Sequence, residues 1–260
     1  MRTTVPVLMY HSVSDDPPAA TRSLSVSLTA FEAQMRHLHD EGITSLTFGD
    51  FMAAEASGRA IPDRAVVITF DDGYADTAER AVPVLARLGL NATVFVTTGW
   101  LADAGPFAAG HPLDRTMTRS QLVDIAQQGI EIGGHSHSHA HLDQLPTDAL
   151  RDELRISRSV LEDLLSTPVP TLAYPFGHSS RRVRREAASV GYRGAAAVEN
   201  ALPGRRTETF AVPRLTIRRS TTQDQFARLV QGTGVSRAFA VDRALTTGYK
   251  VVRAVRSVVP

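Results

Sequence analysis

The sequence contains no cysteine, which excludes disulfide bonds and thiolate ligands and leaves histidine, aspartate and glutamate to hold any metal. Charge of one sign is not in excess either, because the 28 lysines and arginines are nearly balanced by 27 aspartates and glutamates. A net charge of +1 provides no general attraction to nucleic acid, so we expect no nucleic-acid partner.

Long apolar runs are also missing. No segment reaches the roughly 18 apolar residues that a membrane-spanning helix needs. Residues 1–11 carry one positive side chain but no apolar stretch of the length found in signal peptides. The sequence therefore predicts a cytoplasmic protein, and an exported one if a leader precedes residue 1 in the natural chain.

Segments with strand and helix patterns alternate along the chain without a break in composition. Val66–Phe70 is a run of strand-forming residues, Ser27–Leu38 has the pattern of a capped amphipathic helix, and Thr147–Leu165 predicts a long helix with a threonine cap. Repeated strand-then-helix order predicts an α/β domain with a parallel sheet and with functional residues at the carboxyl ends of its strands. We expect this domain to span residues 1–234.

The C-terminal segment 235–260 mixes apolar and basic residues. Its basic residues are Arg237, Arg243, Lys250, Arg253 and Arg256. The pattern predicts a helical tail packed on the domain. A helix lying on a membrane surface is the alternative, but Gly248 interrupts the continuous amphipathic pattern that such contact requires.

Two adjacent carboxylates, Asp71 and Asp72, end the strand-like segment VVITFDDGY, Val66–Tyr74. Like charges this close raise the pKa of one group unless a cation lies beside them, and a metal ion is the candidate. Neighbouring residues of an extended chain face opposite ways, so the two carboxylates do not both point at one metal in the same way. We expect one of them to bind the metal and the other to remove a proton from water. A turn with two solvated acids is the alternative.

Four alternating histidines follow in GGHSHSHAHL, Gly133–Leu142. They are His135, His137, His139 and His141, which form two pairs with a spacing of four residues. Imidazole and carboxylate ligands together suit zinc or a similar divalent first-row metal. The spacing alone does not choose between the two pairs, and a non-catalytic histidine-rich metal tract is the alternative for the whole run.

Both segments resemble motifs of the polysaccharide deacetylases of carbohydrate esterase family four. Thr69–Gly73 matches T-F-D-D-G, His135–His139 matches H-[S/T]-x-x-H, and the resemblance extends from about Val5 to about Leu215. It implies a distorted (β/α) barrel of about seven parallel strands. It also implies that Asp71 is the base and that Zn²⁺, or Co²⁺, Ni²⁺ or Mn²⁺, is held by Asp72, His135 and His139.

The third motif departs from the family pattern Arg-x-Pro-[F/Y]-Gly, because this chain has AYPFG at Ala173–Gly177. Ala173 stands where the family has the arginine that orients the base. Arg214 is the candidate to replace that arginine, and an ordinary surface salt bridge is the alternative for it. A backbone N–H near Phe176 is the candidate donor to the oxyanion, since Pro175 has no N–H.

The family's late Leu-x-x-His motif, which carries the general acid, is absent, and no histidine follows His178. Some relatives begin with a V-L-x-Y-H segment like Val7–His11. We therefore expect His11 to protonate the leaving amine, with His178 as the second candidate. A histidine whose polar atoms are satisfied by packing at the strand end is the alternative for His11.

The resemblance implies a metal-dependent hydrolase that removes N-acetyl groups from an amino-sugar-containing glycan or glycoconjugate and releases acetate, with an N-acetylated sugar as its partner. A small, lipid-linked or nucleotide-linked sugar is an alternative substrate, favoured by the missing signal peptide. A catalytically inactive carbohydrate-binding protein is a further alternative. Asp71 argues against it, because a binding module needs no base beside a metal ligand.

Overall fold

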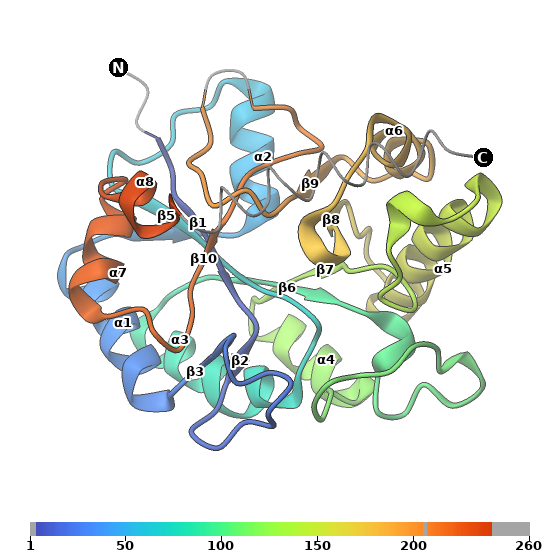
Figure 1. Cartoon of the computed structure of the whole chain (residues 1–260), viewed down its shortest axis with the longest axis horizontal. Coiled ribbons are helices and arrows are strands. Elements are labelled where there is room, and N and C mark those ends of the chain that lie inside the picture. Colours follow the sequence, from blue (N-terminus) through green and yellow to red (C-terminus); the bar gives the residue numbers. More distant parts are fainter. Residues whose placement is uncertain (1–3, 205–206, 241–260) are drawn as a thin grey trace.

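Eight parallel strands form the central sheet of the structure, a computed structural model that describes residues 4–204 and 207–240. Their order is β10-β1-β5-β6-β7-β8-β9, and β4 pairs with the first half of β5 (Figure 1). The strands are β1 (Val7–Tyr10), β4 (Thr44–Leu46), β5 (Ala65–Phe70), β6 (Thr93–Val96), β7 (Glu131–Gly134), β8 (Thr171–Ala173), β9 (Gly194–Ala196) and β10 (Leu215–Thr216). A separate pair of short strands joins β2 (Ser12–Val13) to β3 (Ser25–Val26).

The two ends of the sheet meet through the segment that precedes β10. Val212 bridges to Ala196 of β9, and the Asn200 N–H donates to the Arg214 carbonyl at 3.0 Å. On its other side β10 pairs with β1, where Leu8 lies opposite Leu215. The sheet therefore curls round, and the predicted distorted (β/α) barrel is confirmed.

Helices follow the strands and cover the outside of the curled sheet (Figure 1). They are α1 (Leu28–Asp40), α2 (Phe48–Ser57), α3 (Val82–Leu88), α4 (Arg119–Gln127), α5 (Thr147–Leu165), α6 (Arg181–Ser189), α7 (Gln223–Val230) and α8 (Val235–Ala238). The Ser27 hydroxyl caps α1 by accepting from the Ala30 N–H at 3.2 Å, as the sequence predicts.

The start of α5 differs from its prediction. The helix has the predicted bounds, but Pro146 occupies the capping position and Thr147 is already helical, so no side chain caps it. Buried Leu150, Leu154 and Leu161 lie at helical spacing and face the sheet, while the opposite side of α5 is polar.

Alternate side chains of β5 point to opposite faces of the sheet and pack in two different hydrophobic clusters. Val66, Ile68 and Phe70 pack outward against the helices, in the larger hydrophobic cluster. Val67 packs in the smaller cluster with Phe95 and residues of α2, which fills the barrel. The same alternation directs Thr69 and Asp71 to the side of Val67, so the strand delivers a carboxylate to the barrel interior.

A buried carboxylate, Glu131, lies at the opposite, amino-terminal end of the strands. It accepts the N–H of Gly49 in α2 at 2.8 Å and the hydroxyls of Thr93 at 2.6 Å and Thr171 at 2.8 Å. Burial raises the pKa of Glu131, and the three donors partly offset that effect. Glu131 therefore ties β6, β7, β8 and α2 together beneath the site.

The described part of the predicted tail contains α8, where Val235 and the following Phe239 are buried in the core. Residues 241–260 lie outside the described residues, so a tail that begins at residue 235 stays a prediction. Within the described ranges, no helix combines the length and apolar character required to span a bilayer.

Candidate active site

The candidate residues lie at the carboxyl ends of neighbouring strands. Asp71 and Asp72 follow β5, His135 follows β7, and His11 follows β1. Because the strands are parallel, these ends meet at one edge of the barrel. In addition, the Asp71 N–H donates to the Tyr10 carbonyl at 3.0 Å, which joins the ends of β5 and β1.

Asp72, His135 and His139 form the one three-residue group of metal-ligating side chains found within residues 4–204 and 207–240, and their ligand atoms lie within 4.8 Å of one another. Asp72 Oδ1 is 3.4 Å from His135 Nε2 and 3.3 Å from His139 Nε2. His135 Nδ1 is 2.8 Å from the Ala173 carbonyl, to which it donates as an N–H, so Nε2 is the nitrogen left for a ligand bond.

These residues fit a divalent metal. Asp72 Oδ1 is buried and accepts no hydrogen bond from the described residues. Burial works to raise the pKa of Asp72, but the imidazoles of His135 and His139 hold it well below its usual range. An ionised oxygen without a hydrogen-bond donor, facing two imidazole nitrogens, is the donor set of a catalytic site for zinc or a similar ion.

The loop between the two histidine ligands is held by Glu153 of α5. Its carboxylate accepts the backbone N–H groups of His137 at 2.9 Å and Ser138 at 2.8 Å, and the Ser138 hydroxyl at 2.6 Å. The loop has a strained backbone, since φ is +63° at both Ser136 and His139. The sequence gives no signal for Glu153, which is one acid among several on a polar helix face.

The structure separates the two histidine pairs that the spacing leaves equivalent. His137 Nδ1 is 2.9 Å from the Thr98 hydroxyl, and the His137 carbonyl accepts the Gly99 N–H at 2.7 Å. The His141 ring stacks on Phe176, with ring centroids 3.9 Å apart. Within the described residues, His137 and His141 therefore belong to the walls of the site and not to the metal-ligating group.

Asp71 pairs with Arg214, whereas Asp72 approaches the two imidazoles. The Arg214 guanidinium donates to both oxygens of Asp71, at 2.6 and 2.7 Å, and to the Thr69 hydroxyl at 3.1 Å. Arg214 is fully buried, and its Nε donates to the Ala197 carbonyl at 3.3 Å. The pair is thus internal, and the alternative of a surface salt bridge is wrong.

The pair keeps Asp71 ionised. Burial works to raise the pKa of Asp71, but the Arg214 guanidinium and the His135 imidazole outweigh it and hold the pKa below its usual value. An oriented, ionised carboxylate beside the metal-ligating group has the properties of a general base.

His11 lies beside both carboxylates. Burial lowers its pKa, against the opposing effect of Asp72 and Asp71. Its Nδ1 is buried and has no hydrogen-bond partner among the described residues. The alternative of a histidine satisfied by packing is therefore not supported, because one ring nitrogen is left available.

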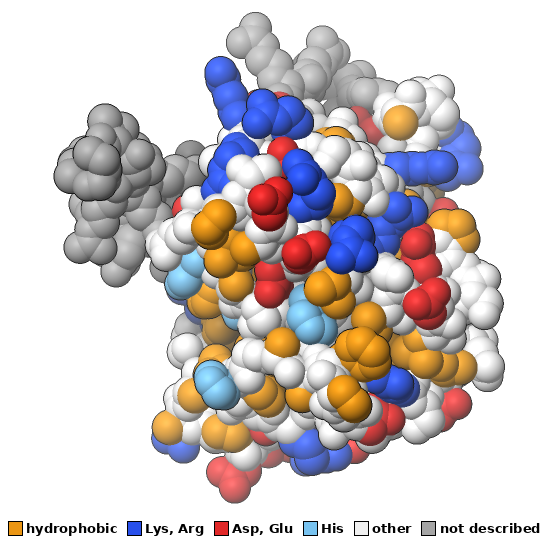
Figure 2. Space-filling view, turned by 90° about the vertical axis from the view of Figure 1, so that its right-hand side faces the viewer, with side chains coloured by type: hydrophobic (Ala, Val, Ile, Leu, Met, Phe, Trp, Pro, Cys, Tyr) orange, Lys and Arg blue, Asp and Glu red, His pale blue; other side chains and the backbone are white. Residues whose placement is uncertain are grey.

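Aromatic rings flank His139 on two sides. The centroids of Trp100 and Phe176 each lie 4.7 Å from that of His139. Phe176 has the left-handed φ of +59° and is 48 % exposed, whereas Trp100 and Tyr74 are buried. Figure 2 looks onto the side of the molecule that carries α5 and α6, where histidine and hydrophobic side chains lie together on the surface.

This chain belongs to the polysaccharide deacetylase family, whose model matches residues 58–195. The resemblance predicted from the two motifs is confirmed, and with it the prediction of an enzyme of the deacetylase class.

Individual relatives are similar over most of the chain. A Bacillus subtilis protein, YxkH, which carries the name of a polysaccharide deacetylase, is 29% identical over 213 residues, covering 82% of this chain and 71% of its own length. The poly-beta-1,6-N-acetyl-D-glucosamine N-deacetylase of Escherichia coli is 23% identical over 257 residues, which span 86% of this chain but 38% of that enzyme.

Solved structures share the fold. The Streptococcus pyogenes deacetylase PplD, in complex with acetate, matches with a TM-score of 0.79 and 23% identity, over 88% of this chain and 99% of its own. The Bacillus cereus polysaccharide deacetylase BC0361 matches with a TM-score of 0.74 and 28% identity, over 88% of this chain and 69% of its own.

Proposed function

We propose that this protein is a metal-dependent hydrolase that removes N-acetyl groups from an amino-sugar-containing glycan, releasing acetate and a free amine. The observation that carries the proposal is the division between two adjacent carboxylates. Asp72 faces His135 and His139, whereas Asp71 faces Arg214. The name of the Escherichia coli relative, an N-deacetylase of a polymeric amino sugar, supports the substrate class.

Asp72, His135 and His139 would hold the metal. When bound there, a divalent cation supplies Lewis-acid polarisation of the acyl carbonyl and activation of water. Asp71 accepts the proton of the attacking water as the new C–O bond forms. Arg214 holds both oxygens of Asp71, which fixes the direction from which that carboxylate takes the proton.

Two further groups act on the other side of the acyl carbon. The backbone N–H near Phe176 donates to the oxygen that becomes negative when water adds. His11 gives a proton to the amide nitrogen as the C–N bond breaks, so that the sugar leaves as a neutral amine and acetate remains. The exposed ring of Phe176 offers an apolar face for a sugar ring next to the reacting group.

The test is acetate release from a panel of N-acetylated sugars, from monomers to long oligomers. Metal-stripped protein should be inactive, and Zn²⁺, Co²⁺, Ni²⁺ or Mn²⁺ should restore release. Asp71→Asn should bind metal with unchanged affinity and release no acetate, whereas Asp72→Asn should lose both metal affinity and activity.

The outcomes separate the alternatives. Release from monomers or nucleotide-linked sugars alone would replace the glycan by a small substrate. A carbohydrate-binding protein would give two results together. The metal-loaded wild type would release no acetate from any sugar of the panel, and the Asp71→Asn variant would bind the glycan as tightly as the wild type does.

A further inference from the structure

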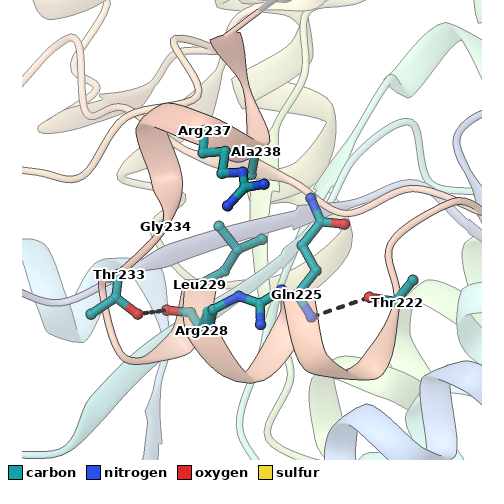
Figure 3. A pocket seen from close by; sticks show the side chains of 8 residues that line it. All are labelled: Thr222, Gln225, Arg228, Leu229, Thr233, Gly234, Arg237 and Ala238. Atoms are coloured by element: carbon teal, nitrogen blue, oxygen red, sulfur yellow. Dashed lines mark hydrogen bonds between the residues drawn. The ribbon is translucent and has the colours of Figure 1, made fainter.

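A second hollow, unrelated to the site above, lies between α7 and α8 (Figure 3). Its volume is about 510 Å³, within the range of small-molecule sites. Figure 1 shows α7 and α8 on the opposite side of the barrel from α5, the helix that holds the histidine loop. A ligand in this hollow is therefore not a substrate of the proposed deacetylase reaction.

Two arginines line the hollow, and no described acid pairs with either of them. Figure 3 shows the guanidinium group of Arg237, from α8, above Leu229 and that of Arg228, from α7, below it, and both arginines line the hollow. Neither forms an ion pair with a described residue, and Asp224, one turn before Arg228, does not pair with it. By contrast, Arg184 elsewhere on the surface lies 2.6 Å from Glu208.

The connection between the two helices is fixed, so the hollow is preformed. The Thr233 N–H and hydroxyl both donate to the Arg228 carbonyl, at 2.8 and 3.1 Å. Gly234 turns the chain with the left-handed φ of +70°, and α8 starts directly after it. This geometry keeps Arg228 and Arg237 on the walls of one hollow, where a bound anion would offset the repulsion between their positive charges.

Other groups around the hollow complement an anion with an organic part. Gln225 extends its amide toward the same space and forms no side-chain hydrogen bond with a described residue. Leu229 forms an apolar floor.

We propose that this hollow binds the phosphate group of a phosphate ester. Two forked guanidinium groups match the geometry of phosphate oxygens and form strong, charge-assisted hydrogen bonds with them. Gln225 contributes an N–H to the phosphate oxygens. A soluble phosphate ester and a phospholipid head group both carry this chemistry.

Calorimetric titration of the full-length protein with inorganic phosphate and with glycerol 3-phosphate, at constant ionic strength, tests the site. Arg228→Gln/Arg237→Gln should weaken binding by about tenfold or more, because each lost guanidinium removes charge-assisted hydrogen bonds. Arg59→Gln/Arg193→Gln is the matched control, since it removes the same charge from two exposed arginines outside the hollow and should leave binding unchanged. All four substitutions are at exposed positions, so unchanged melting temperatures show that the variants fold.

Sedimentation with phosphatidylglycerol vesicles, compared with phosphatidylcholine vesicles, separates the two sources. If the wild type binds the anionic vesicles and the Arg228→Gln/Arg237→Gln variant does not, the site binds a lipid head group. Binding of glycerol 3-phosphate without vesicle binding assigns it to a soluble ester. Binding that is absent, or equal in the wild type and the Arg228→Gln/Arg237→Gln variant, would overturn the proposal.

Discussion

Arg214 and Asp71 are separated by 143 residues in the sequence, yet they form a two-fold hydrogen-bonded ion pair inside the barrel. Both side chains are almost completely buried, so solvent screens their attraction little. Arg214 lies directly before β10 and contacts Asp71 from there, so it takes the place that the resemblance to the family predicts for an arginine at position 173.

Removing the arginine should destabilise the protein strongly. Arg214→Ala leaves the Asp71 carboxylate buried without a partner, which we expect to lower the free energy of unfolding by about 3–5 kcal/mol. Arg184→Ala is the control, since its partner Glu208 is mostly exposed and the expected loss is at most about 1 kcal/mol. Urea unfolding measures both, and equal losses in the two variants would contradict the prediction.

The same pair predicts a coupling between stability and chemistry. Adding Asp71→Asn to Arg214→Ala should recover part of the lost stability, since the second change removes the unpaired charge. Arg214→Ala should still bind metal but should turn over more slowly. Turnover equal to that of the wild type would show that Arg214 has no part in orienting the base.

Glu153 should control metal affinity through the histidine loop. Metal-stripped Glu153→Ala should bind Zn²⁺ about 10- to 100-fold more weakly, because nothing then fixes the two N–H groups between the ligands. Glu153→Gln should recover much of the affinity, since its amide oxygen accepts the same N–H groups. Asp152→Ala is the control, an exposed acid on α5 that pairs with Arg155. Competition titration gives the affinities, and wild-type affinity in Glu153→Ala would contradict the role.

His11 should matter only for poor leaving groups. His11→Ala should slow acetate release from an N-acetylated sugar by about a hundredfold or more, since amine departure requires a proton. Cleavage of an aryl acetate should change little, because a phenolate leaves without protonation. The exposed His111→Ala is the control. Equal loss on both substrates would assign His11 to the structure of the site and not to proton donation.

Glu131 should give stability a pH dependence of a defined sign. Burial raises the pKa of this carboxyl in the folded protein above its ordinary value of 4.5. The contribution of Glu131 to the free energy of unfolding is therefore fully present below pH 4.5 and is lost as the pH rises through the raised pKa. Subtracting the unfolding free energies of Glu131→Gln from those of the wild type, across pH 4–8, should show this fall. A difference that stays constant or rises with pH would contradict it.

The order of strands and helices predicts the parallel sheet because each element follows from a local pattern. The acid pair and the histidines lie in short motifs at strand ends, and the resemblance of these motifs to the deacetylase family predicts the barrel and the metal-ligating group. Where the patterns left alternatives, as between the two histidine pairs, the contacts of His137 with Thr98 and of His141 with Phe176 separate them.

Other features depend on contacts between distant segments and have no local signal. Glu153 is one of several acids on α5, and only the packing of that helix brings it to the loop. The Ala173 carbonyl, which orients His135, is a backbone group that any residue provides. The predicted threonine cap of α5 is wrong because Pro146 occupies the capping position and Thr147 is already the first helical residue.

The position of Arg214 in the seam between β9 and β1 has a consequence for the biosynthesis of the protein. The acid pair and the histidines are translated long before the segment 212–216, which closes the barrel and brings the guanidinium to Asp71. Until that segment emerges from the ribosome, Asp71 has no arginine partner. Among the described strands β10 is the last in the sequence, so the ion pair forms only in a chain that has been synthesised through the segment that closes the barrel.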